Sequence, residues 1–271
     1  MTWVPPYAAD KAKANLTSDL GMADALTHVG LQFWIPTKAG GIERAPFPEA
    51  TDAAIIELRD WGHANGIRVL LCIYNAPAGK WDWPLARSGF ADHPKEFVKA
   101  LLDEVERLNL DGVDMDLEGD GEYPPSEKEP FIAFMKDLSK ELRARGKHLT
   151  VDTFAYEWHA PNQKWWPELF PLVDGLTTMG YEEIGMTATP ATDPWRAYAA
   201  QRDVAGEHKH KLMIGLPANK DEWRGNKLAE QLEWIRKDGT TGVSFWDAQI
   251  PGKAWQTKQT WETIRSIRNA D

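Results

Sequence analysis

The sequence predicts one closed (β/α)8 barrel, a TIM barrel, that spans residues 1–271 as a single domain, and three observations support this fold class. Short apolar segments recur along the chain, amphipathic segments with helical spacing separate most of them, and the composition shows no break. Strands that alternate with helices form parallel sheets, and single-domain barrels often reach this length. A doubly wound open sheet is the alternative, but no G-x-G-x-x-G sequence follows an early strand.

Eight segments predict strands because each is short, apolar and rich in β-branched or aromatic residues. In chain order they are Trp3–Tyr7, His28–Ile35, Arg68–Tyr74, Gly112–Glu118, Leu149–Phe154, Gly175–Tyr181, Lys211–Leu216 and Gly242–Trp246. Glycines close before several of them are expected for turns that lead from a helix into a strand.

Six segments predict helices through their amphipathic spacing. They are Asp52–Asn65, Pro94–Leu108, Glu129–Arg145, Trp195–Val204, Lys227–Lys237 and Thr260–Arg268. In the second of these, apolar residues recur with the spacing of a stripe that faces a core: Phe97, Leu101, Leu102, Val105 and Leu108. The segment between the first two strands has the least regular helical pattern.

The overall charge restricts the partners that the protein can have. The chain carries a formal net charge of -10 at pH 7. Nucleic acid and anionic membrane surfaces are therefore not expected as partners, whereas neutral or cationic substrates fit this charge. The sequence contains no run of about 18 apolar residues, the length needed to span a membrane. We expect a monomer that binds neither nucleic acid nor a membrane.

The single cysteine, Cys72, rules out an intramolecular disulfide framework and lies in an apolar strand, so we expect a buried, unreactive thiol. The N-terminal sequence MTWVPPYAAD has neither a basic region nor an apolar core of the signal-peptide type. We expect the mature domain of a secreted protein to which an initiator Met has been added.

The segment LNLDGVDMDLEGDGEY, residues 108–123, places several acids inside a predicted strand. Because residues two apart share a face of a strand, Asp114, Asp116 and Glu118 point one way and the intervening apolar residues the other. In a barrel, the acids would face the lumen and Glu118 would lie at the C-terminal end, where barrel active sites are found. Neighbouring buried carboxyls raise at least one pKa, and a carboxyl that stays protonated near neutral pH can act as a general acid.

Two other interpretations of these acids remain open. The strand could lie at a sheet edge and expose a solvated acidic face. Alternatively, DLEGDGEYPPSE, residues 116–127, has acids at calcium-loop positions 1, 3, 5 and 12 and Gly121 at position 6. Two prolines inside the loop and a strand instead of a helix before it disfavour calcium. We therefore expect no metal and no cofactor.

The sequence from Asp111 to Glu118 resembles the D-G-x-D-x-D-x-E signature of family 18 glycoside hydrolases, the chitinases and endo-β-N-acetylglucosaminidases, and matches all five of its fixed positions. Further similarities cover most of the chain: LTHVGLQFW at 26–34, MGYEE at 179–183, GLPAN at 215–219 and GVSFW at 242–246. VLLCIYN at 69–75 departs from the third-strand S-x-G-G motif, and Glu182 stands where Asp is usual.

The resemblance implies a barrel enzyme in which the acetamide group of the substrate is the nucleophile, an exception to the usual pair of carboxylates. Glu118 would then protonate the glycosidic oxygen and later act as the base toward water. Asp116 would orient the acetamide, Asp114 would adjust the protonation of Asp116, and Tyr181 would hydrogen-bond the acetamide oxygen. Trp246 would form the floor under the reacting sugar.

Aromatic residues are expected to supply further sugar contacts, because sugar rings pack on aromatic faces. The chain contains 14 Trp, and several follow predicted strands at the face where substrate would lie. The predicted substrate contacts besides Trp246 are Tyr74, Trp83, Trp158, Met179 and Glu182. Trp61, Trp234 and Trp261 lie in helical patterns and are expected to fill the core. His208 and His210 lie in a polar turn without metal-ligand spacing, so we expect solvated side chains.

The preferred function is a retaining endo-glycosidase for β-1,4-linked N-acetylglucosamine, a chitinase. Within the same class, an endo-β-N-acetylglucosaminidase that cuts N-glycans is the alternative. From another class, an inactive, lectin-like barrel is possible, although such relatives usually lack the acid that Glu118 supplies here. Only about 25 residues connect the last two predicted strands, which leaves no room for a large inserted domain beside the site. This favours an open cleft and endo action.

Overall fold

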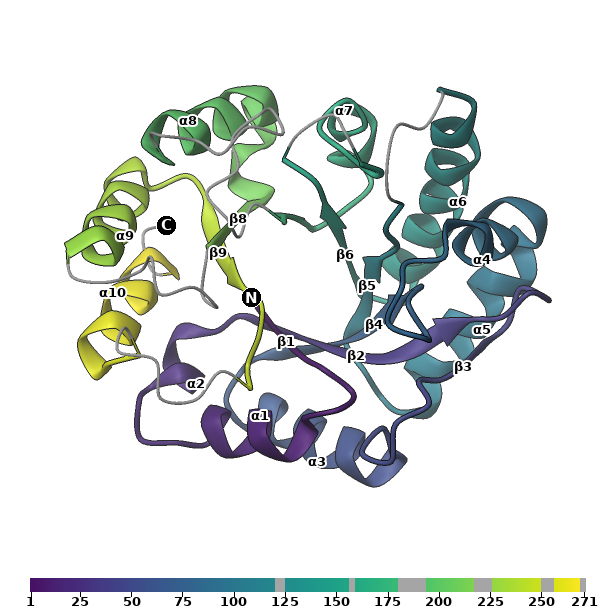
Figure 1. Ribbon diagram of the computed structural model, residues 1–271, viewed down its shortest axis with the longest axis horizontal. Helices are drawn as coiled ribbons and strands as arrows, with labels where there is room; N and C mark the ends of the chain where they lie inside the picture. The colour runs from purple at the N-terminus through teal and green to yellow at the C-terminus, as the bar shows by residue number, and fades with distance from the viewer. Residues whose placement is uncertain (120–124, 156–158, 180–193, 217–225, 250–255, 269–271) are drawn as a thin grey trace.

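The computed structural model describes residues 1–119, 125–155, 159–179, 194–216, 226–249 and 256–268. Within these residues, eight parallel strands form a central barrel and the helices lie in a ring around it (Figure 1). The barrel strands are β1 (Thr2–Val4), β2 (His28–Pro36), β4 (Arg68–Tyr74), β5 (Gly112–Asp116), β6 (His148–Thr153), β7 (Gly175–Thr178), β8 (Leu212–Leu216) and β9 (Gly242–Phe245).

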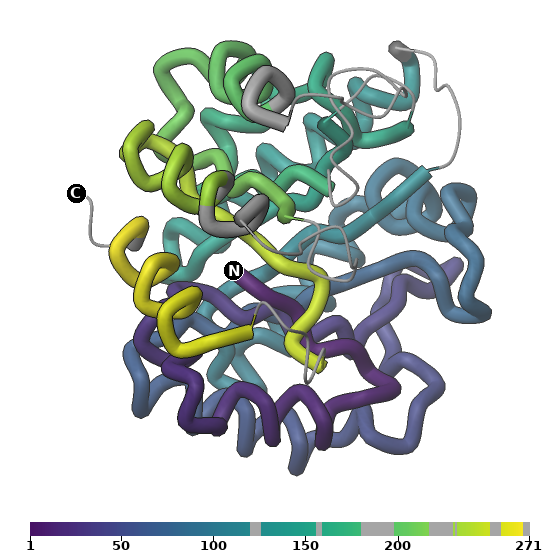
Figure 2. The backbone as a smooth tube through the Cα atoms, turned by 60° about the vertical axis from the view of Figure 1, so that its left-hand side comes forward, coloured from purple at the N-terminus to yellow at the C-terminus, as the bar shows by residue number. Residues whose placement is uncertain are grey.

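The barrel is closed by β1, which pairs in parallel with strands from both ends of the chain. Trp3 lies opposite Gly30 of β2, and Thr2 lies opposite Phe245 of β9. The first strand therefore runs beside the last one, as the tube in Figure 2 shows. This closure confirms the predicted TIM barrel and contradicts the open doubly wound sheet.

A ninth strand in the described chain, β3 (Ile42–Arg44), was not predicted and pairs antiparallel with the end of β2. The turn between the two strands is closed by hydrogen bonds between the backbones of Thr37 and Gly41 and of Gly40 and Thr37, at 2.9 and 3.1 Å. Gly40 has φ of +77° and lies so close to His93 that an added Cβ would be 2.4 Å from its Cβ. The hairpin extends one side of the barrel at the C-terminal ends of the strands.

The described helices follow most of the predicted positions, with ends shifted by a few residues. The longer ones are α3 (Asp52–Ala64), α5 (Pro94–Arg107), α6 (Pro125–Ala144), α8 (Pro194–Ala205), α9 (Asn226–Asp238) and α10 (Lys258–Arg268). α3 begins where the Thr51 side chain accepts a hydrogen bond from the N–H of Ala54, a standard N-terminal cap.

Most of the shorter helices were not predicted, because one or two turns are too few to show a period; the first of them lies between the first two strands, where a helix with an irregular pattern was expected. They are α1 (Ala9–Leu16), α2 (Met22–Ala25), α4 (Trp83–Arg87), the π-helix η1 (Ser88–Asp92), α7 (Trp166–Leu169) and the 3-10 helix η2 (Gly206–Lys211). None of the described helices is both long and apolar enough to cross a lipid bilayer.

Two separate apolar regions hold the barrel together. The larger one lies between strands and helices, and it includes Val113, Met115 and Leu117 together with residues of α5 and α6. The smaller one lies inside the barrel and includes Trp3 and Cys72. The predicted alternation along β5 is therefore confirmed, since its apolar side chains face the helices and its acids face the lumen. This arrangement contradicts the interpretation of an exposed acidic face.

Candidate active site

Three acids of β5 and the residues just after it lie at successive levels of the barrel, from its interior to the mouth at the C-terminal ends of the strands. The exposed fractions are 0% for Asp114, 3% for Asp116 and 9% for Glu118, so exposure increases toward the mouth. Glu118 lies two residues beyond the last strand residue, where the backbone is still held by neighbours. The acids therefore form a graded series in which Glu118 lies nearest to a substrate that enters from the mouth.

Gly112 allows β5 and β6 to pair closely below the acids. A Cβ built on Gly112 would lie 2.0 Å from the backbone oxygen of His148, which no side-chain movement can relieve. Gly112 pairs with His148 in the parallel register of the two strands. The glycine of the motif is thus required by backbone packing and positions the first acid without contacting a substrate itself.

Asp114 is surrounded by hydrogen-bond donors from neighbouring strands. Its Oδ2 accepts the indole N–H of Trp3 at 2.8 Å, and its Oδ1 accepts the hydroxyl of Thr150. Gly30 leaves room for this contact, since a Cβ there would be 2.7 Å from Cδ1 of Trp3. Burial raises the pKa of Asp114, whereas the donors lower it because they stabilise the carboxylate.

Asp116 has fewer donors than Asp114. Its Oδ2 accepts a hydrogen bond from Nε2 of Gln32 at 2.7 Å, but its buried Oδ1 has no N–H or O–H donor among the described residues. Burial, followed by the charge of Asp114, raises the pKa of Asp116 to about 7, while Gln32 and Glu118 oppose this rise. Asp116 is therefore able to change protonation state near neutral pH.

The backbone of Glu118 is fixed by the side chain of Asn75. Oδ1 of Asn75 accepts the N–H of Glu118, and Nδ2 of Asn75 donates to the carbonyl oxygen of Glu118, both at 2.8 Å. The amide side chain thus takes the place of a strand neighbour just after β4 and β5 end. Asn75 is one of the residues that depart from the third-strand motif, and in this position it holds the proposed acid in place.

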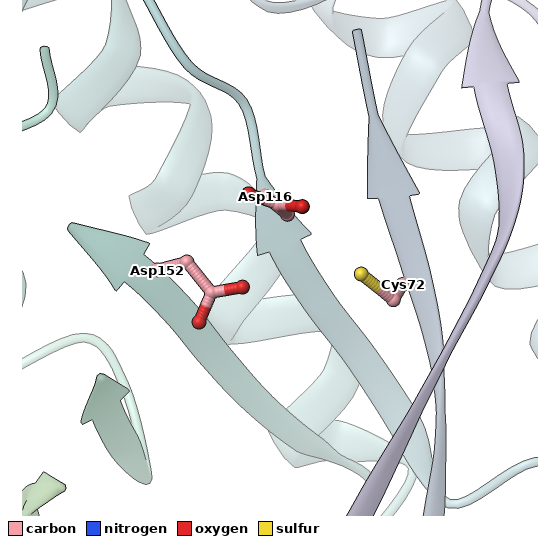
Figure 3. A group of neighbouring side chains, drawn as sticks. All are labelled: Cys72, Asp116 and Asp152. Carbon is pink, nitrogen blue, oxygen red and sulfur yellow. The ribbon is translucent and has the colours of Figure 1, made fainter. Parts of the chain in front are cut away.

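A fourth buried acid, Asp152 of β6, lies beside the β5 acids and was missed by the sequence analysis. Figure 3 shows Cys72, Asp116 and Asp152 on three adjacent strands, and their potential metal-binding atoms all lie within 4.8 Å of one another. Oδ1 of Asp152 accepts the hydroxyl of Thr177. Burial raises the pKa values of Cys72 and Asp152 well above their ordinary values, and the nearby acids raise them further. The predicted burial of Cys72 is confirmed.

The comparison with protein families decides the class of this site. The model of a family described as "Glycosyl hydrolases family 18" matches residues 7–268. The chain belongs to glycosyl hydrolase family 18. It is therefore a glycoside hydrolase, and the resemblance inferred from the acid motif is confirmed for nearly the whole chain.

Solved structures support the fold of this family 18 hydrolase at low sequence identity. A chitinase from Chromobacterium violaceum ATCC 12472 is 17% identical, with a TM-score of 0.75 over 99% of this chain and 98% of the other. A class V chitinase from Pseudomonas fluorescens Pf-5 is 15% identical, with a TM-score of 0.73 over 99% and 100%. The spore cortex-lytic enzyme SleL of Bacillus megaterium QM B1551 is 13% identical, with a TM-score of 0.72 over 98% and 72%. No curated protein sequence matches the chain.

The position of Trp83 in this family 18 hydrolase does not support the predicted sugar contact. Its side chain is only 5% exposed. The ring packs against Phe90 and Trp165 with centroids 5.3 and 6.3 Å apart, and its N–H donates to Glu127 at 3.2 Å. Trp83 begins α4, which directs the indole into the core. We therefore assign Trp83 to packing, as a correction to the sequence prediction.

Another aromatic group lies at the mouth of the barrel, and of its members only Tyr74 was predicted from the sequence as a sugar contact. Trp81 and Phe47 are partly buried and pack against the cluster of Ile35, Ala45 and Tyr74, and Tyr74 is the last residue of β4. The rings of Tyr74 and Trp81 meet edge to face at 6.4 Å, and Phe47 lies 5.7 Å from Tyr7, which is 48% exposed. Burial raises the pKa of Tyr74 to about 12, so its phenol stays protonated. We call Tyr7, Phe47, Tyr74 and Trp81 the aromatic wall.

The remaining predicted contacts of the family 18 hydrolase fall into two groups. Trp246 is partly buried after β9, and its ring centroid lies 6.1 Å from that of Trp3. Met179 is half-buried just after β7, and its N–H donates to the carbonyl of Thr153 at 2.8 Å. Tyr181, Glu182 and Trp158 lie outside the described residues, as do residues 120–124 of the calcium-loop segment 116–127.

The side chains for which the sequence predicted a structural or solvated position lie away from the acids. Asp111 directly precedes β5, at the end of the strand that lies away from the barrel mouth. Its Oδ2 accepts the N–H of Val69 at 2.7 Å and lies 2.9 Å from Nε2 of His63. Trp261 is buried in the core, and the partly buried Trp61 and Trp234 pack against the same core. His210 is exposed, as expected, whereas His208 stacks on Phe170 at 5.6 Å.

Proposed function

We propose that the protein is a retaining endo-glycosidase that hydrolyses β-1,4-linked N-acetylglucosamine polymers, a chitinase. One observation carries this proposal: below Glu118, the buried carboxyl of Asp116 offers an oxygen that has no donor among the described residues. An acetamide N–H is a donor of the right type for that oxygen. A substrate that carries an acetamide next to its scissile bond would therefore complete the site.

The proposed reaction uses the acetamide as the nucleophile and the protein as the proton carrier. Glu118 donates a proton to the glycosidic oxygen, and the acetamide oxygen attacks the anomeric carbon as the bond to the leaving sugar breaks. Asp116 accepts the acetamide N–H and stabilises the positive charge that develops on the nitrogen. Water, deprotonated by Glu118, then opens the cyclic intermediate from the opposite face, which retains the anomeric configuration.

The arrangement of the acids suits this division of roles. General acid catalysis contributes about 10²- to 10⁴-fold, and positioning an intramolecular nucleophile lowers the barrier by about 7 to 11 kcal/mol. Asn75 fixes the backbone of Glu118, so the carboxyl can turn between its two tasks while its attachment stays in place. Asp114, with two donors, supplies a fixed charge below Asp116.

Side chains around the acids would bind the sugars. We propose that Trp246 forms the floor of the reacting subsite and that Tyr181, Met179, Glu182 and Trp158 contact the acetamide or the neighbouring sugars. In place of Trp83, the aromatic wall supplies the flat surface for sugars bound further along the mouth. Its rings lie beside the carboxyl ends of β1, β2 and β4, where substrate reaches barrel enzymes.

The choice of polymer is part of the proposal, because the fold does not distinguish substrates. Chitinases and a spore cortex-lytic enzyme have similar TM-scores to this chain. N-glycans and bacterial spore cortex are therefore the second and third substrates to test. Secretion and a monomeric state belong to the same proposal, since an insoluble polymer is attacked outside the cell by an enzyme whose mouth stays free.

The decisive experiment follows N-acetylchitooligosaccharides by NMR with wild type, Glu118→Gln and Asp111→Asn. The wild type is expected to release the β-anomer, and Glu118→Gln to lose at least about 10²-fold in kcat, the scale of general-acid catalysis. Asp111→Asn alters an acid of the same motif at the far end of β5 and is expected to keep its turnover. Release of the α-anomer, or full activity of Glu118→Gln, would refute the mechanism. Early products from a long polymer separate endo action from the release of disaccharide alone.

A further inference from the structure

Asp152 lies in the acid site but outside the acid motif of β5. It comes from β6, in the sequence VDTF, and is 2% exposed. Two residues before it, Thr150 faces the lumen and donates to Asp114. Because residues two apart share a face of a strand, Asp152 faces the lumen one level higher, beside Asp116 (Figure 3).

The neighbours of Asp152 come from the strands on both sides. β4 contributes the thiol of Cys72, and β5 contributes the carboxyls of Asp114, Asp116 and Glu118. β7 contributes Thr177, whose hydroxyl donates to Oδ1 of Asp152. Each titratable neighbour is itself an acid, so the charge on Asp152 is not balanced by a cation among these groups.

The hydrogen bonds indicate which acid holds the charge. Asp114 accepts two donors, the indole of Trp3 and the hydroxyl of Thr150, so it is the best-stabilised carboxylate of the group. A carboxylate oxygen of Asp152 lies within 4.8 Å of one of Asp116, and two buried carboxyls this close can share a hydrogen bond only if one of them is protonated. Since the hydroxyl of Thr177 donates to Oδ1 of Asp152, that proton is assigned to the other oxygen, Oδ2.

We propose that Asp152 is a positioning residue that carries a proton on Oδ2 and donates it, as a hydrogen bond, to the β5 acid pair Asp114 and Asp116. A neutral donor at this point keeps the negative charge on β5, directly below the place where an acetamide N–H would bind. An ionised Asp152 would instead repel that charge, because buried like charges interact strongly. The strong upward shift of the pKa of Asp152, caused first by burial, agrees with this assignment.

The role in catalysis rests on the proposed function and is tested with two substitutions, of which one keeps the hydrogen-bonding groups at position 152 and the other removes them. Asp152→Asn keeps a neutral donor and the acceptor for Thr177, whereas Asp152→Ala removes both. Asp152→Asn is expected to keep most of the wild-type kcat on N-acetylchitooligosaccharides. Asp152→Ala is expected to lose about tenfold in kcat, the effect of one lost hydrogen bond, with a smaller change in KM. Equal losses in the two variants would show that a carboxylate is required and would overturn the proposal.

Ser244→Ala is the matched control for a general disturbance of the lumen. Its hydroxyl is buried and has no hydrogen-bond partner among the described residues. This variant is expected to retain wild-type kcat. If it loses as much as Asp152→Ala, the effect at Asp152 reflects packing and the positioning role is refuted.

Infrared spectroscopy tests the proton itself and does not depend on turnover. At mildly alkaline pH, Asp116, with a pKa of about 7, is mostly ionised. The wild type is then expected to show, besides any C=O stretch of Glu118, a separate stretch from a second buried, protonated carboxyl, and Asp152→Asn to lose that second component. An unchanged band in Asp152→Asn would overturn the proposal. If the wild type shows the band but cleaves none of the polymers, the proposed function fails while the protonation of Asp152 is supported.

Metal analysis of the purified protein provides a second independent test. Cys72, Asp116 and Asp152 are close enough to share an ion, which would balance their charges instead of protons. The proposal expects no stoichiometric metal after dialysis, in the wild type as in Asp152→Asn. A metal ion that is retained by the wild type and lost from Asp152→Asn would overturn it.

Discussion

Two buried tryptophans provide a matched measurement of what the charge on Asp114 contributes to stability. The indole N–H of Trp3 donates to the carboxyl of Asp114 at 2.8 Å, and that of Trp166 donates to the hydroxyl of Thr153 at the same distance. Their exposed fractions are 1% and 0%. Trp3→Phe and Trp166→Phe therefore make the same chemical change in equally buried places, and only the acceptor differs.

The expected costs differ because the acceptor of Trp3 is an acid. A hydrogen bond to a charged group contributes about 1.5 to 3 kcal/mol, whereas one between neutral groups contributes about 0.5 to 1.5 kcal/mol. Both variants also lose similar apolar contact when indole becomes phenyl. Trp3→Phe is thus expected to lower the free energy of unfolding by roughly 1 kcal/mol more than Trp166→Phe does at neutral pH.

The pH dependence identifies the charge as the cause. The indole N–H stabilises the ionised form of Asp114, so its contribution is present above the pKa of Asp114 in the folded protein and is lost as pH falls through that value. This pKa is raised by burial, which places the loss above the ordinary range of an Asp. The extra cost of Trp3→Phe is therefore expected to shrink in acid, while that of Trp166→Phe stays constant.

Urea denaturation followed by circular dichroism at neutral and mildly acidic pH measures both effects. The two midpoints are converted to free energies with slopes fitted for each variant, because a changed slope would indicate a changed unfolded state. Equal costs for the two variants at neutral pH, or a difference that persists in acid, would refute the assignment of a charged acceptor to Asp114.

Three further predictions concern the barrel and its mouth. Gly112→Ala is expected to cost about 3 kcal/mol in urea denaturation, at the upper end for overpacking, because its Cβ would meet the backbone of His148; a variant as stable as wild type would contradict this steric argument. The pKa of Asp116 in the folded protein, about 7, exceeds that of an unfolded Asp, so its contribution to stability is complete below the unfolded pKa and is lost as pH rises toward 7. Asp116→Asn should therefore reduce the decline of Tm over this range, and an unchanged decline would show that Asp116 is ionised throughout. Trp81→Ala is expected to raise KM for long oligosaccharides with little change in Tm, whereas Trp83→Ala should lower Tm; the reverse pattern would reinstate Trp83 as the sugar contact.

The barrel and its main acids could be predicted because both follow from local patterns. Strand segments and helical stripes repeat along the chain, and alternation on β5 alone placed Asp114 and Asp116 in the lumen. The acid motif then pointed to the family over most of the sequence. These features depend on neighbours in sequence, so they can be recognised without knowledge of the packing.

The features that the sequence did not predict depend on contacts between segments that are distant along the chain. Asp152 is one acid in an apolar strand, and only the pairing of β6 with β5 brings it to Asp116; the alternation of Thr150 and Asp152 was the available signal. In the sequence KWDW, the choice between Trp81 and Trp83 depends on where α4 begins. The Asp82 side chain caps that helix at the N–H of Leu85, which turns Trp83 into the core.

The two hydrogen bonds by which Asn75 fixes the backbone of Glu118 also bear on the chemical stability of the protein during storage. Asn75 acts at once as donor and acceptor, and spontaneous deamidation, a known weakness of asparagine at high temperature, would convert its donor nitrogen into a second oxygen. That oxygen would face the carbonyl oxygen of Glu118 with no hydrogen to share, and a further negative charge would enter the acid group. Asn75 is fully buried, which protects it while the fold is intact. The shelf life of activity at elevated temperature would then be governed by one amide group that takes no part in the reaction.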